Sequence, residues 1–407
     1  MSARTLKQNA HLTYKANLAA GRHSWLRLTP AYSIHLVRAY ARHAAQGTRI
    51  VDPFSGSGTT ALACAEFGHD GYGLDINPFL VWFGSAKTRR YETGDIQAAA
   101  RAIPEICAHA QMLREEPGLW EPPLFNIERW WNPGALQALK ALLAAIRASG
   151  TRGAPLDLLH VAFCRTMIAS SNAAFNHQSM SFAPGSSAHS KHEGIIGRYL
   201  ADAQAIVESA AAPLSGNATL FELDSRRMDE NPAGTFDMLL TSPPYVNRMS
   251  YIRELRPYMY WLGYLRASAH AGQLDWQAIG GTWGSATSNL NAWEPPAAGT
   301  PVDAKIARVC RSIARDGAKN GALLSTYVVK YFHDMWQHFQ AAQRAINAGG
   351  KLVYIVGNST FYGHVVPAQD WYAAMLAELG FTNVDVKPIR KRNSKKELVE
   401  YAVSALR

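Results

Sequence analysis

The sequence predicts a doubly wound α/β fold, in which helices cover both faces of a mostly parallel sheet. A short apolar run from Arg49 to Val51 ends in Asp52 and a Gly/Ser loop, and a helical pattern follows from Thr59 to Phe67. Gly71 to Ile76 then has the pattern of a second strand. A strand, a glycine loop, a helix and a strand in this order are how such a sheet begins.

Further elements extend this beginning in both directions along the chain. Apolar residues at helical spacing predict a helix from Ser33 to Ala45, and Pro30 just before it is an N-terminal signal. The other predicted elements are strands at 218–223, 236–241 and 351–356, helices at 134–148, 156–168, 319–347 and 368–379, and a pair of strands in the basic C-terminal tail.

Two insertions are expected to interrupt the sheet. The core is assigned to residues 23–90, 218–265 and 319–407, because the strand patterns lie there. Residues 91–217 have mainly helical patterns and are expected to form a helical insertion, with a long loop between Ser170 and His192. A smaller insertion is expected at 266–318, where tryptophans stand among Gly, Ser and Asn.

Composition narrows the class of protein. The chain has 407 residues and a formal net charge of +10, which favours a polyanionic partner, although a basic enzyme of another kind has the same charge. The four cysteines have no zinc or redox spacing, so we expect reduced core thiols in a cytoplasmic protein and no metal site. No apolar run reaches the roughly 18 residues of a membrane span, and the polar N-terminus is unlike a signal peptide.

The glycine loop, VDPFSGSGTT, indicates the kind of cofactor. It is neither GxGxxG nor GxxxxGK[ST], so nicotinamide, flavin and nucleotide triphosphates lose support. S-adenosylmethionine (SAM) carries a sulfonium and an adenosine but no phosphate, so its pocket needs close backbone approach, which Gly56 and Gly58 allow. Asp75, at the end of the next strand, is where an acid accepts both ribose hydroxyls.

The other predicted SAM contacts surround these residues. Asp52 can orient the loop or bind the amino group of the methionine, and Phe54 or Ile76 can pack against the adenine ring. Asp224 is a candidate for the adenine amino group, with a helix N-cap as its alternative role. The full predicted cofactor-binding set is Asp52, Pro53, Phe54, Gly56, Gly58, Thr59, Thr60, Asp75, Ile76 and Asp224.

A second motif, TSPPY, follows the strand predicted at 236–241. An aromatic exocyclic amine is a poor nucleophile, because its lone pair is delocalised into the ring. Ser242 and the Pro243 carbonyl can accept both of its N–H hydrogens, while Pro244 stiffens the turn and Tyr245 can stack on the base. In isolation the motif would be only a stiff turn, but its place after a strand and downstream of a SAM loop favours catalysis.

With both motifs, the chain resembles the amino-type DNA methyltransferases, which methylate cytosine N4 or adenine N6. DPFSGSGTT is similar to the SAM motif of that family and TSPPY to its catalytic motif, here in the Ser form that is associated mostly with cytosine N4. The resemblance implies a Rossmann-like methyltransferase sheet, SAM as cofactor, double-stranded DNA as partner and a target base flipped out of the duplex. It leaves open the oligomeric state and whether a cognate restriction endonuclease accompanies the protein.

Alternatives remain at this point. Adenine N6 is the other base target. An RNA base methyltransferase could use the same residues, Ser242 to Tyr245, as a clamp for the amine. A SAM-binding regulatory protein without turnover is the alternative from another class, although it would not need Ser242, Pro243 and Tyr245.

Three regions could hold nucleic acid. The smaller insertion offers stacking and amide side chains for base edges, at Trp276, Trp283, Asn289, Asn291 and Trp293. The helical insertion offers Arg129, Trp130 and Trp131, whose alternative role is ordinary core packing. The basic run at 387–396, and the arginines that follow the clamp at Arg248, Arg253 and Arg256, are candidates for phosphate contacts.

Overall fold

The computed structural model describes residues 6, 9, 12–13, 16–17, 21–28, 32–174, 181–182, 192–247, 250–281, 285–392 and 398–407. Several sequence predictions lie outside these residues: Arg248, Trp283, most of the loop expected between Ser170 and His192, and part of the basic run at 387–396.

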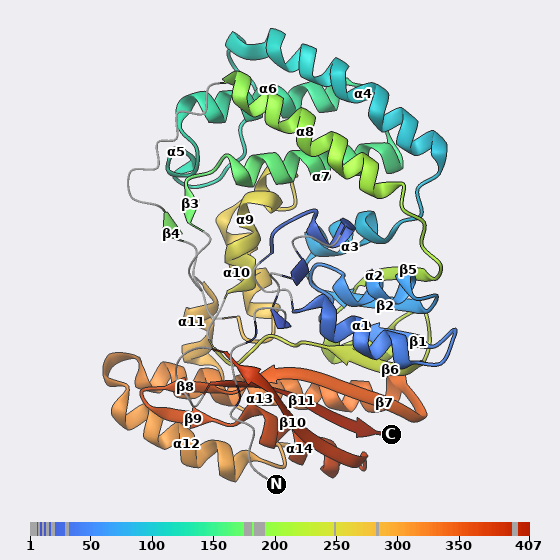
Figure 1. The fold of residues 1–407 in the computed structure, drawn as a ribbon. Coiled ribbons are helices and arrows are strands. Elements are labelled where there is room, and N and C mark those ends of the chain that lie inside the picture. The colour runs from blue at the N-terminus through green and yellow to red at the C-terminus, as the bar shows by residue number, and fades with distance from the viewer. Residues whose placement is uncertain are drawn as a thin grey trace.

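A seven-stranded sheet forms the centre of the molecule. Its strands are β1 (Arg49–Asp52), β2 (Asp70–Asp75), β5 (Asn217–Glu222), β6 (Phe236–Thr241), β7 (Ile346–Gly357), β10 (Thr382–Lys391) and β11 (Val399–Leu406). The spatial order is β10-β11-β7-β6-β1-β2-β5 (Figure 1). The strands from β7 to β5 are parallel, whereas β11 pairs antiparallel with both β7 and β10. The predicted Rossmann-like α/β sheet is confirmed.

Helices cover both faces of this sheet because side chains alternate along each buried strand. Ile50 of β1 packs on one face with Val37 of α1 (Ile34–His43) and Ala63 of α2 (Thr59–Glu66). Val51 points to the opposite face, where α13 (Gly321–Ala345) and α14 (Ala368–Glu378) contribute Phe339 and other apolar side chains. The helix α12 (Asp303–Asp316) packs on α13.

A second layer of helices lies above the sheet, at the top of Figure 1. It contains α4 (Thr93–Met112), α5 (Ile127–Trp130), α6 (Pro133–Ala148), α7 (Gly153–Ala169) and α8 (His192–Ala210). These helices share one apolar core with α3 (Pro78–Thr88) and α9 (Tyr251–Trp261). Trp130 and Trp131 belong to this core, being 7% and 0% exposed, and Trp131 Nε1 donates to the Met167 carbonyl at 2.9 Å. Core packing, the alternative role for these two tryptophans, is therefore what the structure shows.

The remaining elements in the described part of the chain are short. They are the helices α10 (Ser268–Gln277) and α11 (Ser285–Ala292), the 3-10 turns η3 (Gly21–Ser24), η4 (Leu113–Glu115), η5 (Ser225–Glu230) and η6 (Ala318–Asn320), and the strands β3 (Ala173–Ala174), β4 (Ser181–Phe182), β8 (Ser359–Phe361) and β9 (His364–Val366). All four cysteines are buried and unpaired. Among the described residues, no helix has the length and apolar character needed to cross a membrane.

Candidate active site

A cavity of about 360 Å³ opens at the carboxyl ends of β1, β2 and β6. Ligands of open parallel sheets bind at this edge. Both sequence motifs line it: from the predicted SAM set come Pro53, Phe54, Gly56, Thr59, Asp75, Ile76 and Asp224, and from the predicted clamp come Ser242, Pro243, Pro244 and Tyr245. Segments about 190 positions apart in the chain thus share one cavity. Asp52, Gly58 and Thr60 of the predicted set are not among the lining residues.

The glycine loop turns tightly between β1 and α2. Gly56 and Gly58 have φ values of 50° and 69°, in the left-handed region that favours glycine. A Cβ on Gly58 would lie 3.2 Å from the Gly84 Cα in α3, so the loop and that helix approach closely. Gly58 is also the N-cap of α2. The two glycines therefore shape the loop, and only Gly56 faces the cavity.

Asp52 is fully buried and is occupied by protein donors. Its Oδ1 accepts from the Phe54 backbone N–H at 3.0 Å and from the Thr241 hydroxyl at 2.5 Å. Its Oδ2 accepts from the Thr60 hydroxyl at 2.6 Å, and Tyr32 lies at 3.5 Å. Burial raises the pKa of Asp52 to about 6, against the opposing effect of these donors. Of its two predicted roles, this geometry favours orienting the loop.

Asp75 ends β2 and borders the cavity. Its Oδ2 accepts from the Gly56 N–H and its Oδ1 from the Asn77 N–H, both at 2.9 Å. Burial raises the pKa of this carboxyl to about 6. A carboxylate oxygen carries more than one lone pair, so each can still accept a hydroxyl from a ligand.

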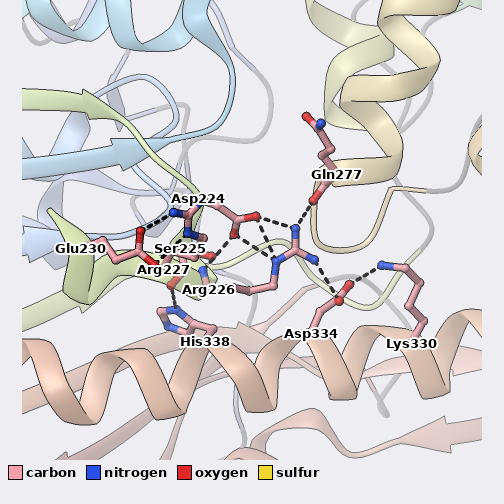
Figure 2. Close-up of polar contacts among 9 residues, drawn as sticks. All are labelled: Asp224, Ser225, Arg226, Arg227, Glu230, Gln277, Lys330, Asp334 and His338. Atoms are coloured by element: carbon pink, nitrogen blue, oxygen red, sulfur yellow. Dashed lines mark hydrogen bonds and ion pairs between the residues drawn. The ribbon is translucent and has the colours of Figure 1, made fainter. Parts of the chain in front are cut away.

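Asp224 lines the cavity but is also tied to its own segment (Figure 2). Its Oδ1 caps η5 by accepting from the Arg226 backbone N–H at 2.9 Å. The Arg226 guanidinium grips both carboxylate oxygens, with Nη2 at 2.6 Å from Oδ2. The same guanidinium reaches Asp334 of α13 at 3.0 Å and the Gln277 carbonyl of α10 at 2.6 Å. Lys330 donates to Asp334 at 2.6 Å and completes the network. Asp224 is thus an N-cap that also faces the cavity.

The clamp segment follows β6 directly. Ser242 donates its hydroxyl hydrogen to the Ile355 carbonyl of β7 at 3.0 Å and also forms a side-chain hydrogen bond with Tyr245. A hydroxyl oxygen has two lone pairs, so Ser242 can still accept from a ligand. The Pro244 carbonyl accepts from the Tyr331 hydroxyl at 2.6 Å, so it is already engaged. Ser242 and Pro243 are therefore the acceptors that this segment can offer to an amine in the cavity.

Tyr245 is held by the C-terminal strands. Its hydroxyl donates to Glu400 Oε1 at 2.7 Å, and the Arg392 guanidinium lies over its ring, 4.7 Å from the centroid. Arg390 binds Glu400 through Nε and Nη2 at 2.8 and 3.0 Å. Burial, and next the charge of Glu400, hold the pKa of Tyr245 well above its usual value.

Sequence reasoning missed four residues that line the cavity or hold its lining residues in place. They are Arg226, Arg390, Arg392 and Glu400. The two tail arginines stand in the basic run that suggested phosphate contacts, and nothing in its local pattern marks them as cavity residues. In the described part of the chain no cluster of three or more His, Cys, Asp or Glu side chains could hold a metal ion.

Comparison with known proteins agrees with the motifs. No family model matches the chain. The chain is 22% identical over 439 residues to the Type II methyltransferase M.BsoBI of Geobacillus stearothermophilus, covering 97% of this chain and 86% of that protein. It is 43% identical over 51 residues to the Type II methyltransferase M.MjaII of Methanocaldococcus jannaschii, covering 12% of this chain and 10% of that protein. The predicted resemblance to this class of methyltransferase is confirmed, since the first similarity spans nearly the whole chain.

Proposed function

We propose that this protein is a SAM-dependent DNA methyltransferase that acts on the exocyclic amine of a flipped base, with cytosine N4 as the preferred target. One observation carries the proposal: the glycine loop with Asp75 and the SPPY segment line the same cavity. A methyl donor and an amine acceptor bound there would be neighbours, which is what direct transfer requires. The similarity to Type II methyltransferases supports the same reaction.

The residues present fit SAM. Gly56 gives close backbone approach, Asp75 offers acceptors for ribose hydroxyls, and Phe54, Ile76 and Leu223 give apolar walls for a ring. Ser55 also borders the cavity, but its buried Oγ lies against Gly73 of β2 and has no hydrogen-bond partner in the described part of the chain. When bound, SAM would supply an electrophilic methyl group on a sulfonium. The protein's part is then to position both reactants and to exclude water.

The clamp residues act on the amine. Ser242 Oγ and the Pro243 carbonyl accept its two N–H hydrogens, which favours a tetrahedral nitrogen whose lone pair is directed at the methyl group. The Tyr245 ring stacks on the base and offsets part of the cost of unstacking it from the duplex, about a few kcal/mol. The Ser form of the motif is the reason to prefer cytosine N4 over adenine N6.

We assign the chemistry to residues 23–90, 218–265 and 319–407, with 91–217 as a helical insertion and 266–318 as the candidate target-recognition insertion. Asn289 and Asn291 of α11 are exposed, as base-edge contacts require. The net charge of +10 suits the phosphates of double-stranded DNA. A cognate restriction endonuclease would be a partner if the protein belongs to a restriction–modification system.

The test is nucleoside mass spectrometry on the DNA and the RNA of a methylation-free host that expresses the chain, with Ser242→Ala as the matched control. N4-methylcytosine that is absent from the control supports the proposal. N6-methyladenine keeps the mechanism and overturns the base assignment. Modified RNA with unmodified DNA favours the RNA alternative, and no modified base in either overturns methyl transfer to nucleic acid.

A further inference from the structure

Glu400 is a buried carboxylate that borders the cavity. Only 3% of the residue is exposed. Its Oε1 accepts from the Tyr245 hydroxyl at 2.7 Å, and Arg390 binds both carboxylate oxygens at 2.8 and 3.0 Å. Replacing a buried ion pair by apolar side chains is often neutral or stabilising, so stability alone does not explain such a pair. Its place beside the SPPY segment suggests a role in the reaction.

Tyr245 is restrained at separate points of the side chain and backbone. Glu400 fixes the hydroxyl, while the Arg392 guanidinium covers one ring face at 4.7 Å from the centroid. Arg392 is itself tied through Nη1 to the Asn358 carbonyl at 2.7 Å. At the other end, the Tyr251 hydroxyl lies 3.4 Å from the Tyr245 backbone nitrogen, which donates to it. A base that stacks on Tyr245 would meet the face opposite Arg392.

We infer that Glu400 is a positioning residue for methyl transfer, which acts by holding the Tyr245 ring in the plane against which the target base stacks. The inference rests on the proposed function. Without the hydrogen bond at its far end, the ring can swing about its side-chain bonds, and a displacement of about 1 Å at a reacting centre can cost roughly a hundredfold in rate. Arg390 fixes Glu400 in turn, and Arg392 supports the ring from behind.

A double-mutant cycle tests whether Glu400 acts through the hydroxyl of Tyr245. The variants are Tyr245→Phe, Glu400→Ala and the two combined, each assayed as the full chain with labelled SAM and unmethylated plasmid DNA. Each single variant should lower kcat about tenfold, which is the loss of one hydrogen bond to a charged group, while the Kd for SAM stays unchanged. The double variant should lose less than the sum of the two single losses, because both changes remove the Tyr245–Glu400 hydrogen bond. Each change also removes a contact of its own, with Ser242 for Tyr245 and with Arg390 for Glu400.

A matched control lies on the same hairpin. Asp385 of β10 forms an exposed ion pair with Lys387 at 2.6 Å, so Asp385→Asn removes an acid without touching the cavity, and kcat should not change. If Glu400→Ala does not fold, Glu400→Gln replaces it in the cycle, with a smaller loss and the same lack of additivity.

The outcomes separate the two proposals. Additive losses in the double variant, or weaker SAM binding in the Glu400 variant, overturn the role of Glu400 while wild-type methylation of DNA still stands. No methyl transfer to DNA by the wild-type protein overturns the proposed function, and the role of Glu400 with it.

Discussion

The Thr241 hydroxyl donates to Asp52 Oδ1 at 2.5 Å, and this contact joins the first residues of the two motifs. It follows from strand register: β1 and β6 are parallel neighbours, with Val51 opposite Leu239, so both strands end at the same edge of the sheet. The glycine loop and the SPPY segment therefore start from a shared point. We expect their mutual placement in the cavity to depend on that hydrogen bond as well as on the sheet.

Removing this contact should cost stability. Thr241→Val keeps the shape of the side chain but deletes a buried hydrogen bond to a carboxylate, so we expect the free energy of unfolding to fall by about 1.5–3 kcal/mol. Urea denaturation followed by circular dichroism measures the change. Thr382→Val, on an exposed part of β10, is the control and should change little. A loss no larger than that of the control would show that the contact does not contribute.

Substitutions of the clamp residues and of the cofactor-binding residues should have different effects: the first should lower turnover and the second should weaken SAM binding. Ser242→Ala removes an acceptor for the amine but touches no predicted SAM contact, so kcat should fall at least a hundredfold with the Kd for SAM unchanged. Asp75→Ala should instead weaken SAM binding, by roughly tenfold or more. Isothermal titration calorimetry and a labelled-methyl assay distinguish the two effects. Equal loss of SAM binding in both variants would contradict this division of roles.

SAM binding should depend on pH through Asp75. Burial raises the pKa of its carboxyl to about 6, and only the ionised carboxylate is an acceptor for both ribose hydroxyls. Below pH 6 the group takes up a proton, so the affinity for SAM should fall as the pH drops through 6 and level off above it. Asp75→Asn should bind more weakly at neutral pH and show a flatter profile from pH 5 to 8. Asp52 titrates in the same range in both proteins, so an equally steep profile in the variant would assign the effect elsewhere.

A substitution of Arg226 should weaken SAM binding, because Arg226 holds Asp224, the candidate for the adenine amino group. It holds Asp224 in a bidentate ion pair and also binds Asp334 and the Gln277 carbonyl. Arg226→Lys keeps the charge but cannot form the planar fork, so the KM for SAM should rise several-fold while kcat changes less. Arg227→Lys, at a neighbouring exposed pair with Glu230, is the matched control. An unchanged KM in Arg226→Lys would show that Asp224 needs no partner.

Much of the central sheet could be predicted from local patterns. The strand expected at 236–241 is β6, and the helix expected from Thr59 to Phe67 is α2 at Thr59–Glu66. These segments are strongly apolar and bounded by loop residues, which is where pattern reasoning is most dependable. Asp75 could be placed for the same reason, since a parallel strand ends at the cavity edge.

The residues that hold the site's side chains in place could not be predicted in this way. Glu400 lies 155 positions after Tyr245, and Arg226 lies 108 positions before Asp334. Each pair is brought together by the packing of strands and helices that are distant in the sequence. The local spacing of residues therefore does not indicate it. The tail arginines illustrate the point, because the same basic composition fits both an exposed phosphate-binding run and the cavity wall that Arg390 and Arg392 form.

The antiparallel strand β11 has a consequence for how the protein matures during synthesis. It is inserted between β7 and β10, so β10 cannot join the sheet until residues 399–406 have been synthesised. A nascent chain that has already folded the glycine loop and β6 therefore still lacks the carboxylate that fixes Tyr245. A chain interrupted before β11 should therefore turn over poorly, because Tyr245 lacks its partner Glu400 and β10 lacks the strand that joins it to β7.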